Sequence, residues 1–266
     1  MKANRPILIA LFGLLLCIAG ICSYRSYEIL HGYNESRRVY GEISTDYVSH
    51  NHSNSSAAAE NKSKSTDSAN NNVSKESFPL TVDFRELRSN LNAEIIGWIW
   101  CQDTVIDYPI VQHADNNYYL NFSVNGDQNA NGAIFLETAN FSDFRDTNSI
   151  LHGHHMGDGT MFASLDHWQA EDYLEKHPTM YLSTPDGNYR VDLFAGFTTP
   201  ANSKAYQYEF SSVSDIQSWI DWIKEESVIH PDLTLSPDDH FLTLSTCAYS
   251  YEDARTVLIG RLSEIT

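Results

Sequence analysis

Two residues near the C-terminus, Cys247 and Arg255, have types and spacing that could support chemistry. Cys247 ends the run 240–247, HFLTLSTC, whose composition favours a β-strand. A cysteine at the end of a strand can lie half-exposed and act as a nucleophile, and a buried core cysteine is the alternative. Arg255 follows eight residues later, just before a second β-rich run over 256–262. A hairpin between the two runs would return Arg255 to the side of Cys247.

A glycine-rich segment over 151–162 holds three histidines within four positions, His152, His154 and His155. Such a cluster is compatible with a zinc site, but in a strand His152 and His154 share one face and His155 faces the other way. A zinc ion would therefore need further ligands from elsewhere. The other interpretation is a tight loop that presents one histidine to a cysteine, whose proton it can accept. We favour this second interpretation, so we expect neither a metal nor another cofactor.

The composition of the 266-residue chain limits its function. Its 35 Asp and Glu against 17 Lys and Arg give a net charge of −18, which argues against a nucleic-acid binder, because such a protein needs a basic surface. Charged residues make up 20% and aromatic residues 12%, as in a folded domain. Cys17 and Cys22 lie in an apolar N-terminal run, so too few cysteines remain for a disulfide framework. We expect Cys101 to be a strand thiol.

The N-terminus has the pattern of a membrane segment. Lys2 and Arg5 precede residues 6–24, which carry no charge. As a helix this run would span roughly 28 Å, close to the hydrocarbon thickness of a bilayer. We therefore predict a membrane anchor over 1–30 with a short cytoplasmic end, a cleavable signal peptide being the alternative. A single anchor with the C-terminus outside the cell is the simplest topology.

A change in composition separates this anchor from a folded domain. Residues 31–77 are predicted to form a polar, flexible linker, because Ser, Asn and Ala dominate 49–77. The mixed sequence of 24–48 could also continue the anchor as a helix. Residues 78–266 carry all of the excess negative charge, because residues 1–77 are close to neutral, and are predicted to form an extracellular domain.

This domain is predicted to be mainly β, with short runs separated by Gly, Pro, Asn and Asp, as in a barrel or sandwich. The β-rich runs are 95–100, 105–111, 133–136, 149–151, 179–184, 189–197, 241–247 and 256–262. A short helix is predicted over 84–90 after Asp83. A second, amphipathic helix is expected on the barrel surface. Its apolar positions are Val213, Ile216, Trp219, Ile220 and Ile223.

Several of these segments resemble the motifs of sortases. The run TLSTC at 243–247, followed by Arg255, resembles the sortase signature, and 153–162 is similar to the catalytic-histidine loop of class B sortases. Further segments that resemble class B are 97–99, 106–112, 115–120 and 132–136. The likeness runs from about residue 80 to the C-terminus. It implies a closed sortase-type β-barrel with a few peripheral helices, one N-terminal to the barrel and one before the cysteine strand.

The resemblance also implies an activity. Sortases are membrane-anchored cysteine transpeptidases of Gram-positive bacteria, so we expect a single-pass membrane protein whose catalytic domain lies outside the cell. Its partners would be surface proteins with a C-terminal sorting motif, cleaved after threonine, and an amine on a cell-wall precursor or a pilin lysine. The lipid bilayer would be a partner through the N-terminal helix, and nucleic acid would not. Class A lacks the longer helix before the cysteine strand, and class C commonly has a second, C-terminal span, so class B fits best.

The resemblance assigns roles to three residues. Cys247 matches the nucleophile that forms a thioacyl enzyme, His154 the group that exchanges protons with the two amines, and Arg255 a donor to the substrate carbonyl. Ser245 lies two residues before Cys247 and shares its face of the strand, so we expect it to contact the sorting peptide. Tyr206 is a further candidate for peptide binding, and no motif covers it.

The chain departs from class B at two positions in the histidine segment. His152 and His155 stand where Tyr and Asn are usual. Two other functions therefore stay open. One is a zinc-dependent hydrolase that uses His152, His154 and His155 as ligands. The other is a non-catalytic surface domain that binds a wall ligand.

Overall fold

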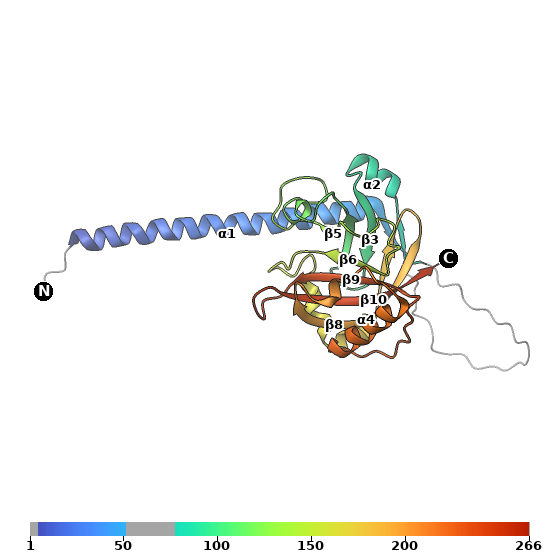
Figure 1. The fold of residues 1–266 in the computed structure, drawn as a ribbon. Helices are drawn as coiled ribbons and strands as arrows, with labels where there is room; N and C mark the ends of the chain where they lie inside the picture. The colour runs from blue at the N-terminus through green and yellow to red at the C-terminus, as the bar shows by residue number, and fades with distance from the viewer. Residues whose placement is uncertain (1–4, 52–77, 266) are drawn as a thin grey trace, which may run out of the picture.

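The computed structural model describes residues 5–51 and 78–265 and is built around eight strands (Figure 1). They are β3 (Ile95–Trp100), β4 (Asp107–Val111), β5 (Ile134–Leu136), β6 (Asn148–His152), β7 (Thr179–Ser183), β8 (Asn188–Pro200), β9 (His240–Cys247) and β10 (Ala254–Ile265). They form a closed barrel in the order β10-β8-β7-β3-β4-β5-β6-β9. Neighbours are antiparallel except for β4 with β5 and β6 with β9, which are parallel. The expected closed β-barrel is confirmed.

Short helices and a small sheet surround the barrel. The sheet pairs β1 (Val48–His50) with β2 (Leu80–Val82). The helices are α2 (Phe84–Asn90), α3 (Glu171–Lys176), α4 (Val213–Glu226) and the 3₁₀ turns η1 (Tyr118–Leu120), η2 (Ala163–Gln169) and η3 (Lys204–Tyr206). The predicted helices are present as α2 and α4. Asp83 caps α2, because its carboxylate accepts a hydrogen bond from the Glu86 amide at 2.9 Å.

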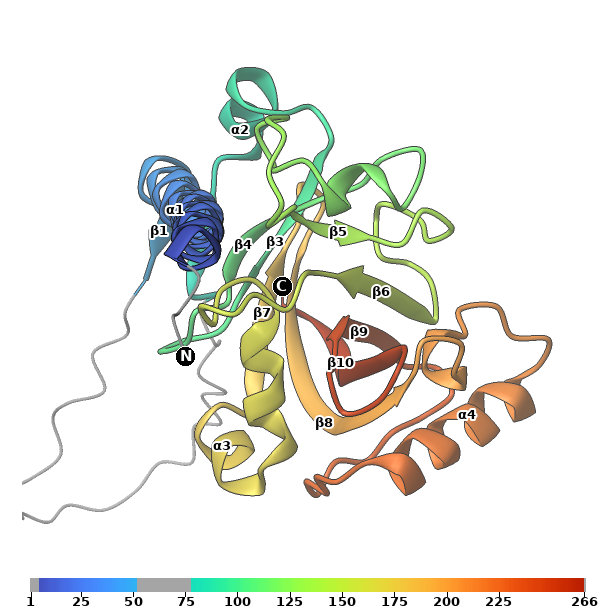
Figure 2. The same ribbon diagram turned by 90° about the vertical axis from the view of Figure 1, so that its left-hand side faces the viewer.

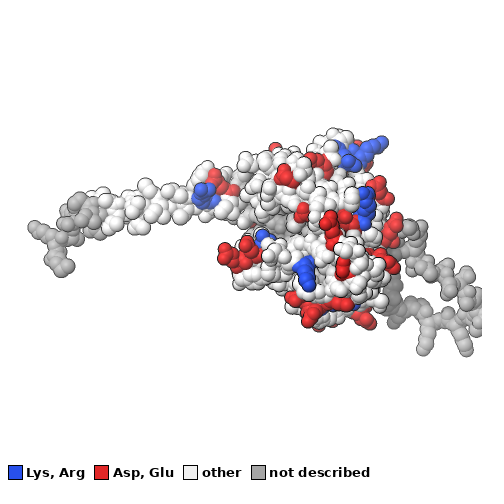
Figure 3. Space-filling model, in the orientation of Figure 1, with Lys and Arg blue, Asp and Glu red and all other residues white. Residues whose placement is uncertain are grey.

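The long helix α1 (Arg5–Tyr47) lies on the opposite side of the barrel from α4 (Figure 2). Among the described residues, Ile9–Tyr47 is the one helical stretch that is long and apolar enough to cross a membrane, by length and composition. Its outer half projects away from the barrel and is almost free of charged side chains, whereas Asp and Glu are spread over the domain (Figure 3).

The start of the predicted flexible linker differs from the structure. Residues 31–47 continue α1, because Tyr40 and Ile43 fall on one helical face and are buried against the domain. The remainder of that predicted linker, 52–77, lies outside the described residues.

Strand β9 separates two apolar environments, because alternate side chains of a strand point to opposite faces. Leu242 and Leu244 join the cluster that fills the barrel. Phe241 points the other way and packs with Trp219 of α4, with ring centroids 5.2 Å apart. Of the apolar positions predicted for this helix, Trp219, Ile220 and Ile223 are buried, and Val213 is 63% exposed. Helix α4 therefore covers part of the outer face of β9 and β10.

Truncation of Phe241 tests the packing beneath α4. We expect Phe241→Ala to lower the free energy of unfolding by about 3–5 kcal/mol, because a fully buried aromatic side chain is lost and a cavity remains. Denaturant unfolding of the two proteins measures the difference. The control is Val213→Ala on the exposed side of the same helix, with an expected change below about 0.5 kcal/mol. Equal losses in the two variants would contradict this packing.

Candidate active site

The β9–β10 hairpin places Cys247 and Arg255 on directly paired positions. Cys247 is a free, half-buried thiol. The Arg255 guanidinium donates to the carbonyl of Ala254 at 2.9 Å, and no carboxylate of the described residues forms an ion pair with it. The predicted hairpin therefore exists, and it leaves a cationic donor beside the cysteine.

His154 comes to the same place through the parallel pairing of β6 with β9. The register puts His152 opposite Ser245, and the Gly153 amide extends the pairing by donating to the Ser245 carbonyl at 3.1 Å. The Nε2 atom of His154 lies 2.8 Å from the carbonyl oxygen of Leu120. Because a carbonyl only accepts, Nε2 carries the proton of this hydrogen bond, and Nδ1 is the nitrogen free to exchange a proton.

Gly132 forms the support behind the His154 ring. It has a φ of +58°, a conformation that favours glycine. A Cβ atom built there would lie 2.3 Å from the Tyr119 carbonyl oxygen and 3.1 Å from Cδ2 of His154. A side chain at position 132 would therefore displace the segment that accepts the hydrogen bond from His154.

All five residues proposed from the sequence line one groove of about 510 Å³. They are His154, Tyr206, Ser245, Cys247 and Arg255. The groove is also lined by Asn116, Asn117, Leu120, Phe135, Glu137, His152, Gly153, Ala201 and Thr246. It opens on the part of the outer β9–β10 face that α4 does not cover. The closed barrel thus gathers residues that are up to about 140 positions apart in the sequence.

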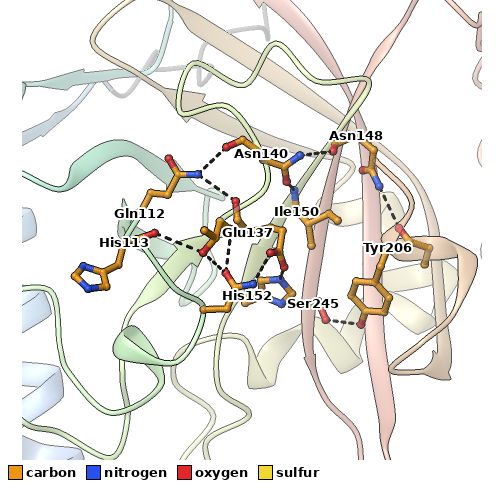
Figure 4. Close-up of polar contacts among 12 residues, drawn as sticks. Gln112, His113, Glu137, Asn140, Asn148, Ile150, His152, Tyr206 and Ser245 are labelled. Atoms are coloured by element: carbon orange, nitrogen blue, oxygen red, sulfur yellow. Dashed lines mark hydrogen bonds and ion pairs between the residues drawn. The ribbon is translucent and has the colours of Figure 1, made fainter. Parts of the chain in front are cut away.

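Tyr206 and Ser245 form one wall of the groove (Figure 4). The Tyr206 hydroxyl and Ser245 Oγ are 2.7 Å apart. Burial raises the pKa of Tyr206, so this hydroxyl stays protonated. The turn that carries Tyr206 is fixed by Asn148, whose Nδ2 donates to the carbonyls of Ala205 and Gln207 at 3.1 and 2.9 Å.

Glu137 is a groove residue that the sequence analysis missed. Its carboxylate pairs with His152, Oε2 lying 3.1 Å from Nε2 (Figure 4). The other carboxylate oxygen accepts a hydrogen bond from Asn116. The hydrogen bond from His152, followed by that from Asn116, lowers the pKa of Glu137 to about 2. Glu137 directly follows the segment 132–136, which resembles class B, and this position could have marked it as a site residue.

The third histidine, His155, belongs to a different network. Its Nε2 lies 2.8 Å from Oδ2 of Asp166, and Oδ1 of the same carboxylate accepts a hydrogen bond from Thr256 Oγ1 at 2.7 Å. Asp166 therefore links His155, which follows His154 in the sequence, to Thr256, which follows Arg255. Asp166 could not be found from the sequence, because it lies in η2 outside every recognised motif.

The three histidines do not converge on one point, since each has its own partner. Among the described residues, no group of three or more His, Cys, Asp or Glu side chains is placed to hold a metal ion. The zinc-hydrolase alternative lacks a ligand set in this geometry. Cys101 differs from Cys247 because it is buried, and its Sγ lies 3.5 Å from the Thr179 carbonyl oxygen. Burial raises the pKa of the Cys101 thiol to about 12.

The Glu137–His152 pair predicts a stability change in acid. Because the pKa of Glu137 is lowered from 4.5 to about 2, its carboxylate stabilises the folded state above about pH 4.5. That contribution disappears as the pH falls towards 2. We expect the free energy of unfolding of the wild type to exceed that of Glu137→Gln at pH 6, and the gap to narrow progressively between pH 4.5 and 2. Denaturant unfolding at a series of pH values measures it.

The matched control is Glu175→Gln, because Glu175 is exposed on α3. We expect this variant to show no comparable pH-dependent gap. A gap for Glu137→Gln that is constant from pH 6 to 2 would show that ionisation of this carboxyl is not linked to folding.

Comparison with known proteins agrees with this geometry. A family model described as the sortase domain matches residues 101–263. Sortase B of Listeria monocytogenes is 36% identical over 198 residues, 74% of this chain and 79% of that protein. A structure of sortase B from Bacillus anthracis gives a TM-score of 0.70 at 31% identity, over 88% of this chain and 99% of that one. A Staphylococcus aureus sortase B–substrate complex gives 0.65 at 30% identity, over 69% and 85%. The chain therefore belongs to the sortase family of cysteine transpeptidases, in its class B.

Proposed function

We propose that this class B sortase is anchored in the cell membrane by α1, cleaves a C-terminal sorting motif after threonine and transfers the new C-terminus to an amine. The observation that supports the proposal best is the shared groove of Cys247, His154 and Arg255, which come from three separate segments. A nucleophile, a proton donor and acceptor, and a cationic donor are together sufficient for acyl transfer.

In the first half-reaction, the Cys247 thiolate forms a bond to the threonine carbonyl carbon. The C–N bond to the following residue then breaks, and His154 donates a proton to the departing amine. Nδ1 of His154 is suited to this exchange because Nε2 is held by the Leu120 carbonyl. Arg255, which has no carboxylate partner among the described residues, stabilises the negative charge on the carbonyl oxygen.

In the second half-reaction, an amine attacks the thioester on Cys247. The new C–N bond forms as the C–S bond breaks, and His154 takes the proton that the amine loses. The acceptor amine belongs to a cell-wall precursor or to a pilin lysine. In the proposed topology the catalytic domain lies outside the cell, so both reactants are expected there.

The groove wall supplies the contacts for the sorting peptide. One of the similar structures is a complex of Staphylococcus aureus sortase B with a substrate, so a relative of this chain binds its substrate on the same fold. In this chain we assign peptide binding to Ser245 and Tyr206, because both line the groove and their hydroxyls can exchange their mutual hydrogen bond for one to the peptide.

Substitution of the three reacting residues tests the proposed function. With peptides that contain Pro-x-Thr-Asn or Pro-x-Thr-Gly and an added amine, we expect cleavage after Thr, transfer to the amine and a thioacyl mass on Cys247. Cys247→Ala should abolish turnover. His154→Ala and Arg255→Ala should lower kcat by about 10²–10⁴ and 10²–10³, because each removes one contributor to the transition state. Mass spectrometry of the products and of the trapped enzyme measures these steps.

Cys101→Ala is the control, because this buried thiol takes no part in the proposed reaction. It should keep its turnover. Full turnover in Cys247→Ala would refute the mechanism. Peptide binding without cleavage in the wild type would instead favour the non-catalytic binding domain.

A further inference from the structure

The second half of α1 packs along the domain behind the histidine segment. Ser36, Tyr40 and Ile43 are spaced at i, i+4 and i+7, so they lie on one helical face, and none is more than 5% exposed. The first half of the same helix projects from the domain (Figure 1), and its apolar side chains from Ile9 to Leu30 are exposed. One continuous helix therefore joins the candidate membrane span to the catalytic domain.

This face of α1 holds the segment that supports the His154 ring. Tyr40 donates a buried hydrogen bond from its hydroxyl to the carbonyl of Gly132 at 2.8 Å. Asn129, three residues earlier, donates from Nδ2 to Ser36 Oγ at 2.9 Å. Gly132 in turn lies against the ring of His154. Two hydrogen bonds from α1 thus fix the wall behind the histidine.

The same face also holds the loop that carries His154. Arg37 forms an ion pair with Asp158, with Nη2 and Oδ2 2.8 Å apart, and the Asp158 side chain is only 10% exposed. The other carboxylate oxygen accepts a hydrogen bond from Thr160 Oγ1 at 2.6 Å. At the end of the loop, the Met161 amide donates to the Tyr108 hydroxyl at 3.0 Å, and the edge of the Tyr108 ring packs against Tyr40.

The histidine loop needs such a restraint, because its own structure is sparse. Between β6 and η2 the chain contains three glycines and forms a single isolated bridge, His155 with Met161. Loops with few internal contacts sample several conformations unless neighbouring elements fix them. The contacts from α1 reach both the loop and the segment behind His154, so they restrain the ring from two sides.

We propose that Arg37 and Tyr40 are positioning residues, through which α1 holds His154 in the orientation that the reaction on Cys247 requires. This inference rests on the proposed function. It makes the helix that leaves the membrane part of the catalytic apparatus. From Tyr24, the last residue of the uncharged run, to Arg37 the helix rises roughly 20 Å. The helix would therefore also hold the catalytic centre close to the bilayer surface.

The experiment uses the full chain in lipid nanodiscs and the variants Arg37→Ala, Arg37→Lys and Tyr40→Phe. We expect Arg37→Ala and Tyr40→Phe to lower kcat for transfer about tenfold and to change the KM for the sorting peptide less than twofold, because the peptide groove is unaltered. Arg37→Lys should recover most of kcat. The charge swap Arg37→Asp with Asp158→Arg should recover more activity than either single change. Thermal unfolding of every variant shows whether it remains folded.

A second measurement does not require the sorting reaction. The alkylation rate of Cys247 by iodoacetamide against pH reports how well a His154 imidazolium stabilises the thiolate. In Arg37→Ala and Tyr40→Phe we expect the midpoint of this alkylation rate against pH to move to higher pH. If the wild type does not transpeptidate but this shift occurs, the proposed function fails and the positioning role stands.

Arg38→Ala is the matched control. Arg38 is adjacent, but it pairs with Glu35 and Glu42 of its own helix and not with the domain. Its kcat and alkylation profile should equal those of the wild type. An unchanged kcat and unchanged alkylation profile in folded Arg37→Ala and Tyr40→Phe would overturn the inference. So would a loss in Arg38→Ala as large as that in Arg37→Ala.

Discussion

The positions of the three proposed reacting groups depend on the pairing of β9 with its two neighbours in the closed barrel. On one side β10 places Arg255 opposite Cys247, and on the other the parallel strand β6 leads directly into Gly153 and His154. The apolar alternation of β9 fixes this register, because Leu242 and Leu244 must face the barrel interior. A slip of one residue would bury Cys247 and expose the two leucines, at a cost of about 1.5–3 kcal/mol for each leucine lost from the core.

The same alternation explains why the groove exists. The outer face of β9 and β10 is apolar at one end, where α4 covers Phe241, and polar at the other, where Ser245 and Cys247 line the groove. Helix α4 thus covers the apolar half of this face and leaves the polar half to the groove. Tyr206, on the turn that leads into α4, forms the boundary between the two halves.

Much of this arrangement could be predicted from the sequence, because its signals are local. The β-rich run that ends in Cys247 and the second run after Arg255 are enough to predict a hairpin. The long-range contacts around the histidine segment could not be predicted in this way. Asp166 meets Thr256 over 90 positions, and Arg37 meets Asp158 over 121. Only the barrel topology and the packing of α1 bring these pairs together.

The predicted linker illustrates the same limit. Residues 31–47 mix charged and apolar side chains, so the sequence left open both a linker and a continuation of the anchor helix. Tyr40 and Ile43 are at helical spacing and are buried. Two apolar positions form too narrow an apolar face to predict from the sequence whether this segment is a helix packed on the domain or a linker. That surface is assembled from β4 and loops more than 60 residues further along the chain.

The charge balance inside the groove also affects Arg255. In a chain with 35 acidic and 17 basic residues, an arginine in a groove would ordinarily be neutralised by a carboxylate. Glu137 lines the same groove, but His152 and Asn116 occupy its two oxygens and hold it ionised in their own network. Arg255 has no carboxylate partner among the described residues, and in the proposed reaction it meets a charge that develops only in the transition state, which is the condition under which a fixed cation lowers a barrier. His152, which departs from the usual class B residue, holds Glu137 in a separate network.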